Sequence, residues 1–357
     1  MQCNGETQDA FVIIWGKVAR LGLKEVTVMA TIDEVATLAK VSVATVSRVM
    51  NNSYVVSEEK RIRVLEAAQQ LGYQPSTYSR NQKRAESKTI LVICSVVIDD
   101  VVDGIQATAN KLGYDVILNY STVRSIDLDS VRFLKNGMVD GVILLNSVFG
   151  VEDQIRLSKM LPVVQCGEYV SVPNSFQVST NNEKGANEVV EHLISLGRKR
   201  IAFVAPKIHI GLPHFVKERE KGYRMALADH DLPFDPSLIV DADFNMDSGL
   251  EAGRRILAMD PRPDAVFCAV DTIAVGCVTA IRDAGLRIPE DIAVAGYDDA
   301  EIAQICSPPL TTVSQPYFEI GGSTMRLLAQ LINEEIQIGR HIMIDHQLKI
   351  RESTVGK

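Results

Sequence analysis

The stretch TIDEVATLAKVSVATVSRVMNN, from Thr31 to Asn52, decides the fold of the first part of the chain. Its pattern predicts two short helices joined by a tight turn at residues 40–41. Thr31 and Glu34 have the spacing of a capping box, in which each side chain bonds the other residue's backbone N–H, so a first helix is expected to begin here. Ser42 is suited to cap the second helix, because its hydroxyl oxygen can accept a hydrogen bond from a backbone N–H of the first turn.

The second predicted helix has two different faces. Helical spacing places Val46, Val49 and Met50 on the inner face. The outer face is small and polar, and it consists of Val43, Ala44, Ser47 and Arg48. Such a face can lie close in a DNA major groove, offer methyl groups to thymine and direct one guanidinium to a guanine edge. The pattern therefore predicts a DNA-binding helix-turn-helix, with a plain helical hairpin as the alternative.

The run from 39 to 75 resembles the headpiece of the Lac repressor family of bacterial transcription regulators. The resemblance rests on AxVSxxTVSRVxN at 39–51, a following helix that begins at Ser57, and GYxP at 72–75. It implies that Val43, Ala44 and Arg48 contact the bases. It also implies phosphate contacts for Ser42, Thr45, Ser47 and Asn51. Lys40 stands where the family often has glycine, so some backbone strain is expected in the turn.

A third helix is predicted from Ser57 to Leu71, where Gly72 ends it. Its expected apolar face is formed by Ile62, Leu65, Ala68 and Leu71. With this helix the headpiece spans residues 29–75, and a polar linker spans residues 76–88.

The linker has the composition of a hinge. In the Lac repressor family this segment folds on DNA, enters the minor groove and inserts a leucine between base pairs. Here Gln82 stands at that position, so a weaker DNA kink is expected, with Arg80, Lys83 and Arg84 supplying electrostatic contacts. The motifs SRNxKRxESxTI at 79–90 and AKVSxATVSR at 39–48 also resemble the cytidine repressor branch of the family.

The charge of the chain is unevenly distributed. The formal net charge is −8, yet residues 29–88 carry nine Lys and Arg against six Asp and Glu, a net charge of +3. Positive charge is thus local to the predicted DNA-binding end. The six cysteines form no CxxC pair, and no apolar run has membrane-spanning length. This usage is typical of a reducing cytoplasm, so a cytoplasmic protein is expected. The family resemblance implies that it is bacterial and nucleoid-associated.

Residues 1–28 precede the expected start of the headpiece. Met29 lies two residues before Thr31, and the codons of residues 24–26 can encode a purine-rich ribosome-binding sequence. The segment is therefore predicted to be either a translated leader that the native protein lacks or a disordered arm that contacts DNA. A signal peptide is not expected, because acidic residues precede the short apolar run at 11–15.

From Thr89 onward, short runs rich in Val and Ile alternate with helical stretches. Such runs are typical of parallel strands buried on both faces and joined by helices, so the sequence predicts a doubly wound α/β fold. The predicted strands are TILVICSVV, DVILNYS, DGVILLN, PVVQC, FQVST, RIAFVAP, AVFCAV, DIAVAGYD and LTTVSQP.

The family resemblance implies a two-lobed, periplasmic-binding-protein-like domain over residues 89–357, which binds an effector, forms the dimer and is crossed by the chain three times. Lobe 1 is expected at about 89–172 and 316–343, and lobe 2 at about 173–315 and 344–357.

Effector-binding residues are expected at the carboxyl ends of the strands, where open α/β sheets bind ligands. Arg219 lies in RxxGY, Asp271 follows AVFCAV, and Asp298 follows AVAGY. An arginine and two carboxylates suit a neutral polyhydroxylic ligand, because each group can bond two adjacent hydroxyls. Arg219 and Asp298 match ligand positions of the family, whereas Asp271 has a helix cap as its alternative role. Further candidates are Asn146, Glu168, Tyr169 and Phe215.

Two departures from the family bear on this site. The loop after the strand at 89–97 lacks the aromatic element that the family usually carries, and Val270 replaces a polar residue before Asp271. The pocket is therefore expected to be more open than in the family. No phosphate-binding glycine motif, metal-ligand spacing or nucleophile elbow occurs, so no cofactor, metal or catalytic residue is expected.

Together these patterns predict a dimeric transcriptional repressor that binds a palindromic operator. A small polyhydroxylic effector is expected to control it, with nucleosides ahead of sugars. No leucine heptad tail follows residue 353, which favours a dimer over a tetramer. The alternatives are a regulator controlled by a protein partner and an enzyme fused to a DNA-binding head. A secreted solute-binding protein is excluded by the predicted headpiece.

Overall fold

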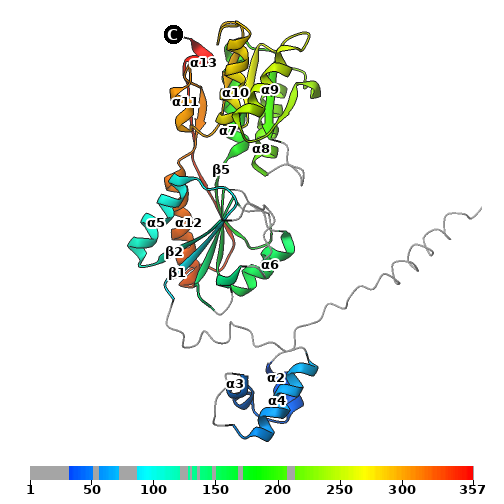
Figure 1. Cartoon of the computed structure of the whole chain (residues 1–357), viewed down its shortest axis with the longest axis vertical. Helices are drawn as coiled ribbons and strands as arrows, with labels where there is room; N and C mark the ends of the chain where they lie inside the picture. Colours follow the sequence, from blue (N-terminus) through cyan, green and yellow to red (C-terminus); the bar gives the residue numbers. More distant parts are fainter. Residues whose placement is uncertain are drawn as a thin grey trace, which may run out of the picture. The chain divides into compact units, whose positions relative to one another are not determined.

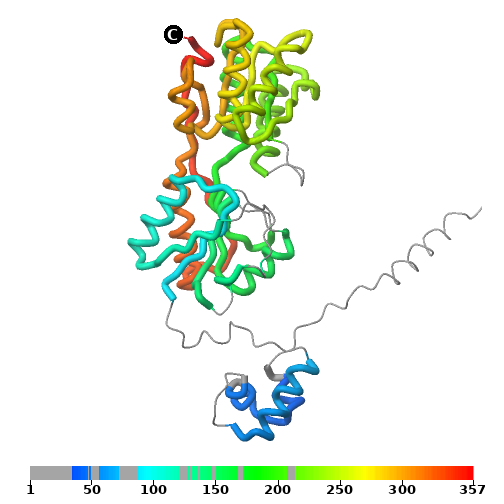
Figure 2. The backbone as a smooth tube through the Cα atoms, in the orientation of Figure 1, coloured from blue at the N-terminus to red at the C-terminus, as the bar shows by residue number. Residues whose placement is uncertain are grey.

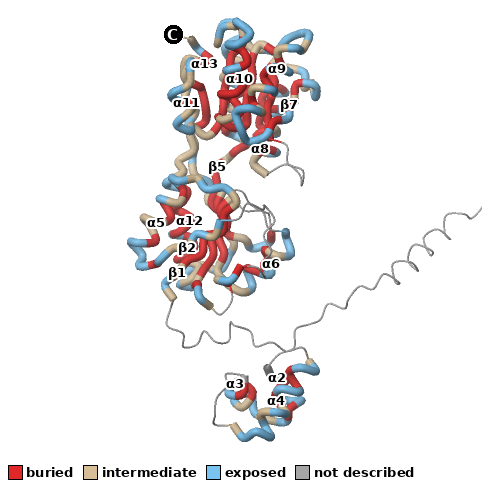
Figure 3. Tube along the Cα trace, in the orientation of Figure 1, coloured by how far each residue is buried: buried red, intermediate tan, exposed pale blue. Residues whose placement is uncertain are grey.

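The structure is a computed structural model that describes residues 32–50, 56–71, 87–120, 128, 131–134, 137–146, 150–167, 172–206 and 214–356. It divides into two compact units, residues 1–84 and 85–357. Figures 1 and 2 follow the chain through both units, and Figure 3 shows where its residues are buried. No helix among the described residues is long and apolar enough to cross a membrane.

The described part of the first unit is a three-helix headpiece. Its helices are α2 (Ile32–Ala39), α3 (Val43–Met50) and α4 (Glu58–Gln70). They pack around one apolar cluster, consisting of Val35, Ala36, Ala39, Val46, Val49, Val64, Ala67 and Ala68. The predicted helix-turn-helix and the third helix are therefore confirmed.

Helix α4 buries a face that only partly overlaps the predicted one. Ile62 and Leu65 are 48% and 50% exposed, whereas Val64 is fully buried. Val64, Ala67 and Ala68 follow an i, i+3, i+4 pattern, and the next member of that stripe, Leu71, is partly buried against the same cluster. The prediction is confirmed for Ala68 and Leu71 and wrong for Ile62 and Leu65, in whose place Val64 and Ala67 face the core.

We expect Val64→Ala to destabilise the headpiece by about 2 kcal/mol, because it removes two methyl groups from a packed core and leaves a cavity. Leu65→Ala is the matched control on the same helix and should change stability by less than about 0.5 kcal/mol. Native-state hydrogen exchange of the α2 and α4 amides measures both values. The reverse order of effects would favour the face that the sequence predicts.

The second unit begins with a six-stranded parallel sheet in the order β11-β5-β4-β3-β1-β2. The strands are β1 (Thr89–Cys94), β2 (Asp115–Tyr120), β3 (Gly141–Leu145), β4 (Val163–Cys166), β5 (Phe176–Thr180) and β11 (Arg340–Ile344). Helices α5 (Asp99–Leu112) and α12 (Tyr317–Ile332) pack together over one face, and α6 (Val151–Met160) lies over the other (Figure 1). The short helix η3 (Arg132–Leu134) adds Leu134 to the core beneath α6.

A second parallel sheet has the order β7-β6-β8-β9. Its strands are β6 (Ile201–Pro206), β7 (Ile239–Ala242), β8 (Ala265–Cys268) and β9 (Ala293–Ala295). One apolar cluster joins it to α7 (Asn182–Ser195) and α8 (His214–Asp229), and another joins it to α9 (Met246–Leu257) and α10 (Asp271–Asp283). The predicted doubly wound α/β architecture is thus confirmed in both lobes.

Short elements complete the second unit. They are η4 (Pro236–Leu238), α11 (Glu301–Ile305), α13 (Glu352–Val355) and the antiparallel pair β10 (Thr312–Ser314) and β12 (Gln347–Lys349).

The chain passes between the two sheets three times, at residues 180–182, 314–317 and 344–347. The last two positions agree with the expected lobe boundaries. The first does not, because β5 is hydrogen-bonded to β4 in the first sheet. Lobe 1 therefore extends to Thr180 rather than to about residue 172. The buried run FQVST lies between β4, which precedes it, and β11, which follows it more than 150 residues later, and no local pattern indicates that pairing.

Candidate functional site

The N-terminus of α3 is capped as the sequence predicts. The Ser42 hydroxyl oxygen accepts a hydrogen bond from the backbone N–H of Thr45 at 3.2 Å, and the two hydroxyl oxygens lie 2.9 Å apart. Lys40, in the turn before it, has a φ of 52°, the left-handed conformation that glycine adopts most easily. The expected strain in the turn is therefore present.

The outer face of α3 is exposed. Val46 and Val49 are buried in the headpiece core, while Val43 is 40% exposed and Ala44 and Arg48 are also exposed. A narrow face of this kind, with one long cationic side chain, fits the width of a major groove. Several predicted DNA contacts lie outside the described residues: Asn51, Arg80, Gln82, Lys83, Arg84 and the side chain of Ser47.

In the second unit, the Arg219 guanidinium on α8 is buried and bonded on several sides. Its Nε donates to Asn182 Oδ1 at 2.9 Å, one Nη donates to the carbonyl oxygen of Ala269, and the other Nη lies 3.3 Å from Asp298 Oδ1. The side chain is only 4% exposed. The structure thus brings Arg219 and Asp298 together, as expected from the family match.

Aromatic rings surround this ion pair. The Arg219 guanidinium carbon lies 3.5 Å from the centroid of Tyr297 and 4.6 Å from that of Phe215. Phe215 in turn lies 6.1 Å from Phe244, a 40% exposed ring just after β7. Phe244 is not among the predicted residues. It lies two residues after β7, whose short run IVDA is interrupted by the exposed Asp241, so the sequence pattern does not indicate a strand end there.

The Asp298 carboxylate is held by donors from two directions. Besides Arg219, Gln315 Nε2 donates to its Oδ1 at 2.8 Å and the Tyr317 hydroxyl donates to the same atom at 3.0 Å. Burial raises the pKa of Asp298, while Arg219 and these hydrogen bonds act in the opposite direction. The side chain remains 23% exposed, so a ligand can reach it.

Asp271 is buried and already bonded within the protein. It is the first residue of α10, but its oxygens accept from the Thr312 hydroxyl at 2.7 Å and from the backbone N–H of Ala300 at 2.9 Å. These bonds reach β10 and the N-cap of α11 rather than the first turn of α10. Asp271 therefore ties neighbouring segments of lobe 2 together, which differs from both the predicted effector contact and the alternative helix cap.

Burial, and next the neighbouring Asp298 carboxylate, raise the pKa of Asp271 from its ordinary 3.8 to about 8. The folded chain therefore binds the Asp271 proton more tightly than the unfolded chain does. The free energy of unfolding falls as pH rises from about 4 toward 8, because the buried carboxyl must then lose that proton. We therefore expect the unfolding free energy of the parent chain to fall relative to that of Asp271→Asn between pH 5 and pH 8. Urea unfolding of both proteins at the two pH values measures this difference. A difference that stays constant with pH would contradict the raised pKa.

The remaining candidates do not join this cluster in the described structure. Asn146 follows β3 in lobe 1, where its carbonyl oxygen accepts from the Ser95 hydroxyl at 2.7 Å and its N–H donates to Cys166. Glu168 and Tyr169 lie outside the described residues. The connection from β1 to α5 spans only residues 95–98, which confirms that the aromatic loop expected of the family is missing.

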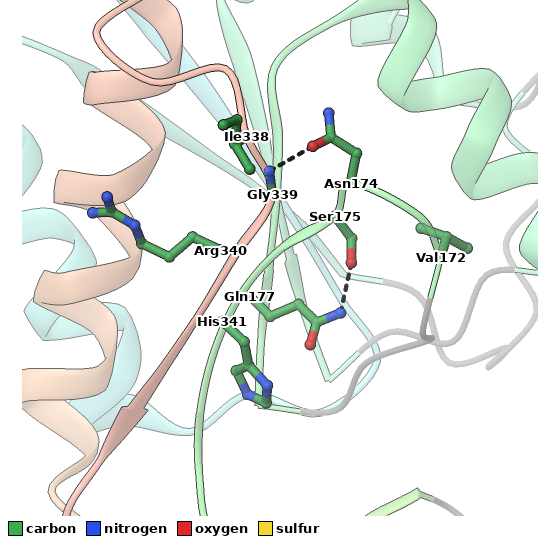
Figure 4. Close-up of a pocket in the computed structure, with 8 residues that line it drawn as sticks. All are labelled: Val172, Asn174, Ser175, Gln177, Ile338, Gly339, Arg340 and His341. Carbon is green, nitrogen blue, oxygen red and sulfur yellow. Dashed lines mark hydrogen bonds between the residues drawn. The ribbon is translucent and has the colours of Figure 1, made fainter.

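A separate polar pocket of about 430 Å³ lies at the amino ends of the paired strands β5 and β11 (Figure 4). Asn174 Oδ1 accepts from the Gly339 N–H at 2.5 Å, and Gln177 Nε2 donates to the Ser175 hydroxyl at 2.7 Å. None of the predicted effector residues lines this pocket, and it lies at the amino ends of the strands, whereas open α/β sheets bind ligands at the carboxyl ends. No group of histidine, cysteine, aspartate and glutamate among the described residues is arranged to hold a metal ion.

The chain combines a helical unit that has an exposed recognition-type helix with an α/β unit that holds an arginine, a carboxylate and aromatic rings in one cluster. This combination defines the class of ligand-responsive transcription regulators. Comparison with known proteins agrees with this. Residues 31–76 match the family model of bacterial regulatory proteins, lacI family, and residues 190–354 match the periplasmic binding protein-like domain.

Relatives match along nearly their whole length. The chain is 36% identical over 337 residues to the HTH-type transcriptional repressor CytR of Escherichia coli strain K12, covering 91% of this chain and 96% of that protein. It is 34% identical over 338 residues to the repressor PurR of Vibrio cholerae serotype O1 strain M66-2, covering 92% and 98%.

Solved structures of regulators match as well. The transcriptional regulator CelR in complex with cellobiose has a TM-score of 0.68 at 31% identity, with 91% of this chain and 99% of that chain covered. The Lac repressor dimer bound to operator and an anti-inducer has a TM-score of 0.66 at 27% identity, with the same coverage. The chain therefore belongs to the LacI family of bacterial regulatory proteins and is a DNA-binding transcriptional regulator.

Proposed function

We propose that this regulator is a repressor that binds a palindromic operator as a homodimer and is controlled by a nucleoside. The observation that carries the effector class is the Arg219–Asp298 pair beside the rings of Phe215 and Phe244. A carboxylate and a guanidinium suit ribose hydroxyls, and an aromatic ring offers a stacking surface for a base. The similarity to the transcriptional repressors CytR and PurR supports a repressor.

Sugars are the second candidate effector class. The similar regulator CelR was solved as a complex with cellobiose. A sugar would use the same charged pair, but it would make less use of two adjacent rings. The similar proteins are repressors and regulators, which supports a regulator over an enzyme fused to a DNA-binding head.

Thermal unfolding of the full chain with cytidine, adenosine, ribose and glucose tests the effector class, because a ligand that binds the native state must stabilise it. We expect a nucleoside to raise Tm and Asp298→Ala to abolish the rise. Asp291→Ala is the matched control, because Asp291 pairs with Arg287 on the surface at 3.0 Å, and it should leave the rise intact.

A rise with sugars alone would replace nucleosides by sugars as the effector class. The absence of any rise with the whole panel would favour control by a protein partner.

A further inference from the structure

The Asp298 carboxylate is connected by hydrogen bonds to the segments that pass between the lobes. Gln315 lies in the second crossing, and its Nε2 donates to Asp298 Oδ1 at 2.8 Å. The Oε1 of the same amide accepts from the Thr180 hydroxyl at 2.6 Å, and Thr180 is the last residue of β5, at the first crossing. One side-chain amide thus joins the candidate effector carboxylate to two of the three crossings.

Tyr317 adds a link to lobe 1. It is the first residue of α12, and its hydroxyl donates to Asp298 Oδ1 at 3.0 Å while accepting from Gln315 Nε2 at 2.9 Å. Helix α12 packs on α5 and on the first sheet. The backbone of Asp298 belongs to lobe 2, because its N–H donates to the Val313 carbonyl at 2.9 Å. A lobe 2 carboxylate is therefore bonded to the start of a lobe 1 helix.

The bonding of the carboxylate is one-sided. Arg219, Gln315 and Tyr317 all reach Oδ1, and among the described residues no side-chain or backbone donor is bonded to Oδ2. A ligand hydroxyl that donates to Oδ2 would not have to displace these bonds. It would, however, fix the rotation of the carboxylate, on which the geometry of all three bonds depends.

We propose that Gln315, held by Thr180 and Tyr317, is the positioning residue that couples occupancy of Asp298 to the arrangement of the two lobes. This inference rests on the proposed function. A ligand shifts a conformational equilibrium only through its different affinity for the two states. The bonds that join Asp298 to the crossings can supply this difference in affinity. They orient the carboxylate for a ligand only when the two lobes are arranged so that Gln315 and Tyr317 reach it. Their loss should reduce allosteric coupling more than ligand affinity.

The test is Thr180→Val in the full chain, which removes the hydroxyl bonded to Gln315 and leaves the Asp298 side chain intact. Calorimetry measures cytidine affinity, and fluorescence anisotropy measures operator affinity with and without cytidine. We expect cytidine affinity to change by less than about threefold, while the effect of cytidine on operator affinity, typically about 5- to 150-fold in such systems, falls at least fivefold. Gln315→Met, which loses all three side-chain hydrogen bonds of Gln315, should act in the same direction.

Thr324→Val is the matched control. Thr324 is also buried, but its hydroxyl donates to the Ile320 carbonyl of its own helix at 2.8 Å. Cytidine should change the operator affinity of this variant as it does that of the parent. Unchanged coupling in both Thr180→Val and Gln315→Met would overturn the proposal.

A measurement without ligand separates this proposal from the effector class. Hydrogen exchange at the Asp298 N–H should become at least about threefold faster in Thr180→Val and in Asp298→Ala, because the first removes the donor to Gln315 and the second removes the Oδ1 acceptor, and both belong to the same chain of bonds. The double variant should show little further acceleration, since residues in one network are not additive. If no nucleoside binds, this non-additivity still supports the connection, whereas full additivity would overturn it.

Discussion

Arg48→Ala is expected to lower operator affinity by about 30-fold to 10⁴-fold. A bidentate arginine–guanine contact contributes about 1–3 kcal/mol of discrimination, and the proposed dimer uses two of them, so about 2–6 kcal/mol is lost. The side chain is exposed on α3 and lies outside the headpiece core, so the fold should not change. Fluorescence anisotropy with operator DNA and with random DNA at several salt concentrations measures the effect.

Lys60→Ala is the matched control for loss of one positive charge. Lys60 is exposed on α4, outside the predicted base-reading helix α3, and its loss should weaken binding to operator and to random DNA alike. Arg48→Lys keeps the charge but loses the planar fork, so it should retain non-specific binding and lose specificity. Equal loss of operator and random DNA binding in Arg48→Ala would refute base contact by Arg48.

The headpiece and the central strands could be predicted because their patterns are locally complete. Ser42 caps α3 with its own hydroxyl, and strands such as β1 and β6 are continuous apolar runs buried on both faces. The strands that were missed are different. β7, β11 and β12 are short, and polar or charged residues interrupt them, so they have no continuous apolar run. Their strand conformation depends on pairing with distant strands, which no single segment of the sequence shows.

The candidate site could be predicted only in part, because strand ends mark positions but not orientations. Arg219 and Asp298 are indeed in contact. Asp271 occupies a similar position in sequence, yet its carboxylate bonds Thr312 and Ala300. These partners lie 41 and 29 residues further along the chain, and no local pattern links them. The same holds for Gln315, whose importance depends on two partners brought together by the chain crossings.

Arg219→Ala is expected to destabilise lobe 2 by about 3–5 kcal/mol. Removing one partner of a buried ion pair leaves the other charge uncompensated, and here the carbonyl of Ala269 and the amide of Asn182 also lose a donor. The stacking on Tyr297 and Phe215 is lost as well. Nucleoside binding should disappear at the same time. Urea unfolding and calorimetry with cytidine measure the two effects.

Arg224→Ala is the matched control on the same helix, because Arg224 pairs with Glu220 at 2.5 Å while its side chain is 50% exposed. A surface pair of this kind contributes at most about 1 kcal/mol, so this variant should stay close to the parent in stability and in cytidine binding. Asp298→Asn should restore part of the stability lost in Arg219→Ala, because it removes the uncompensated charge. Similar losses in Arg219→Ala and Arg224→Ala, without such restoration, would show that the buried pair has no special energetic role.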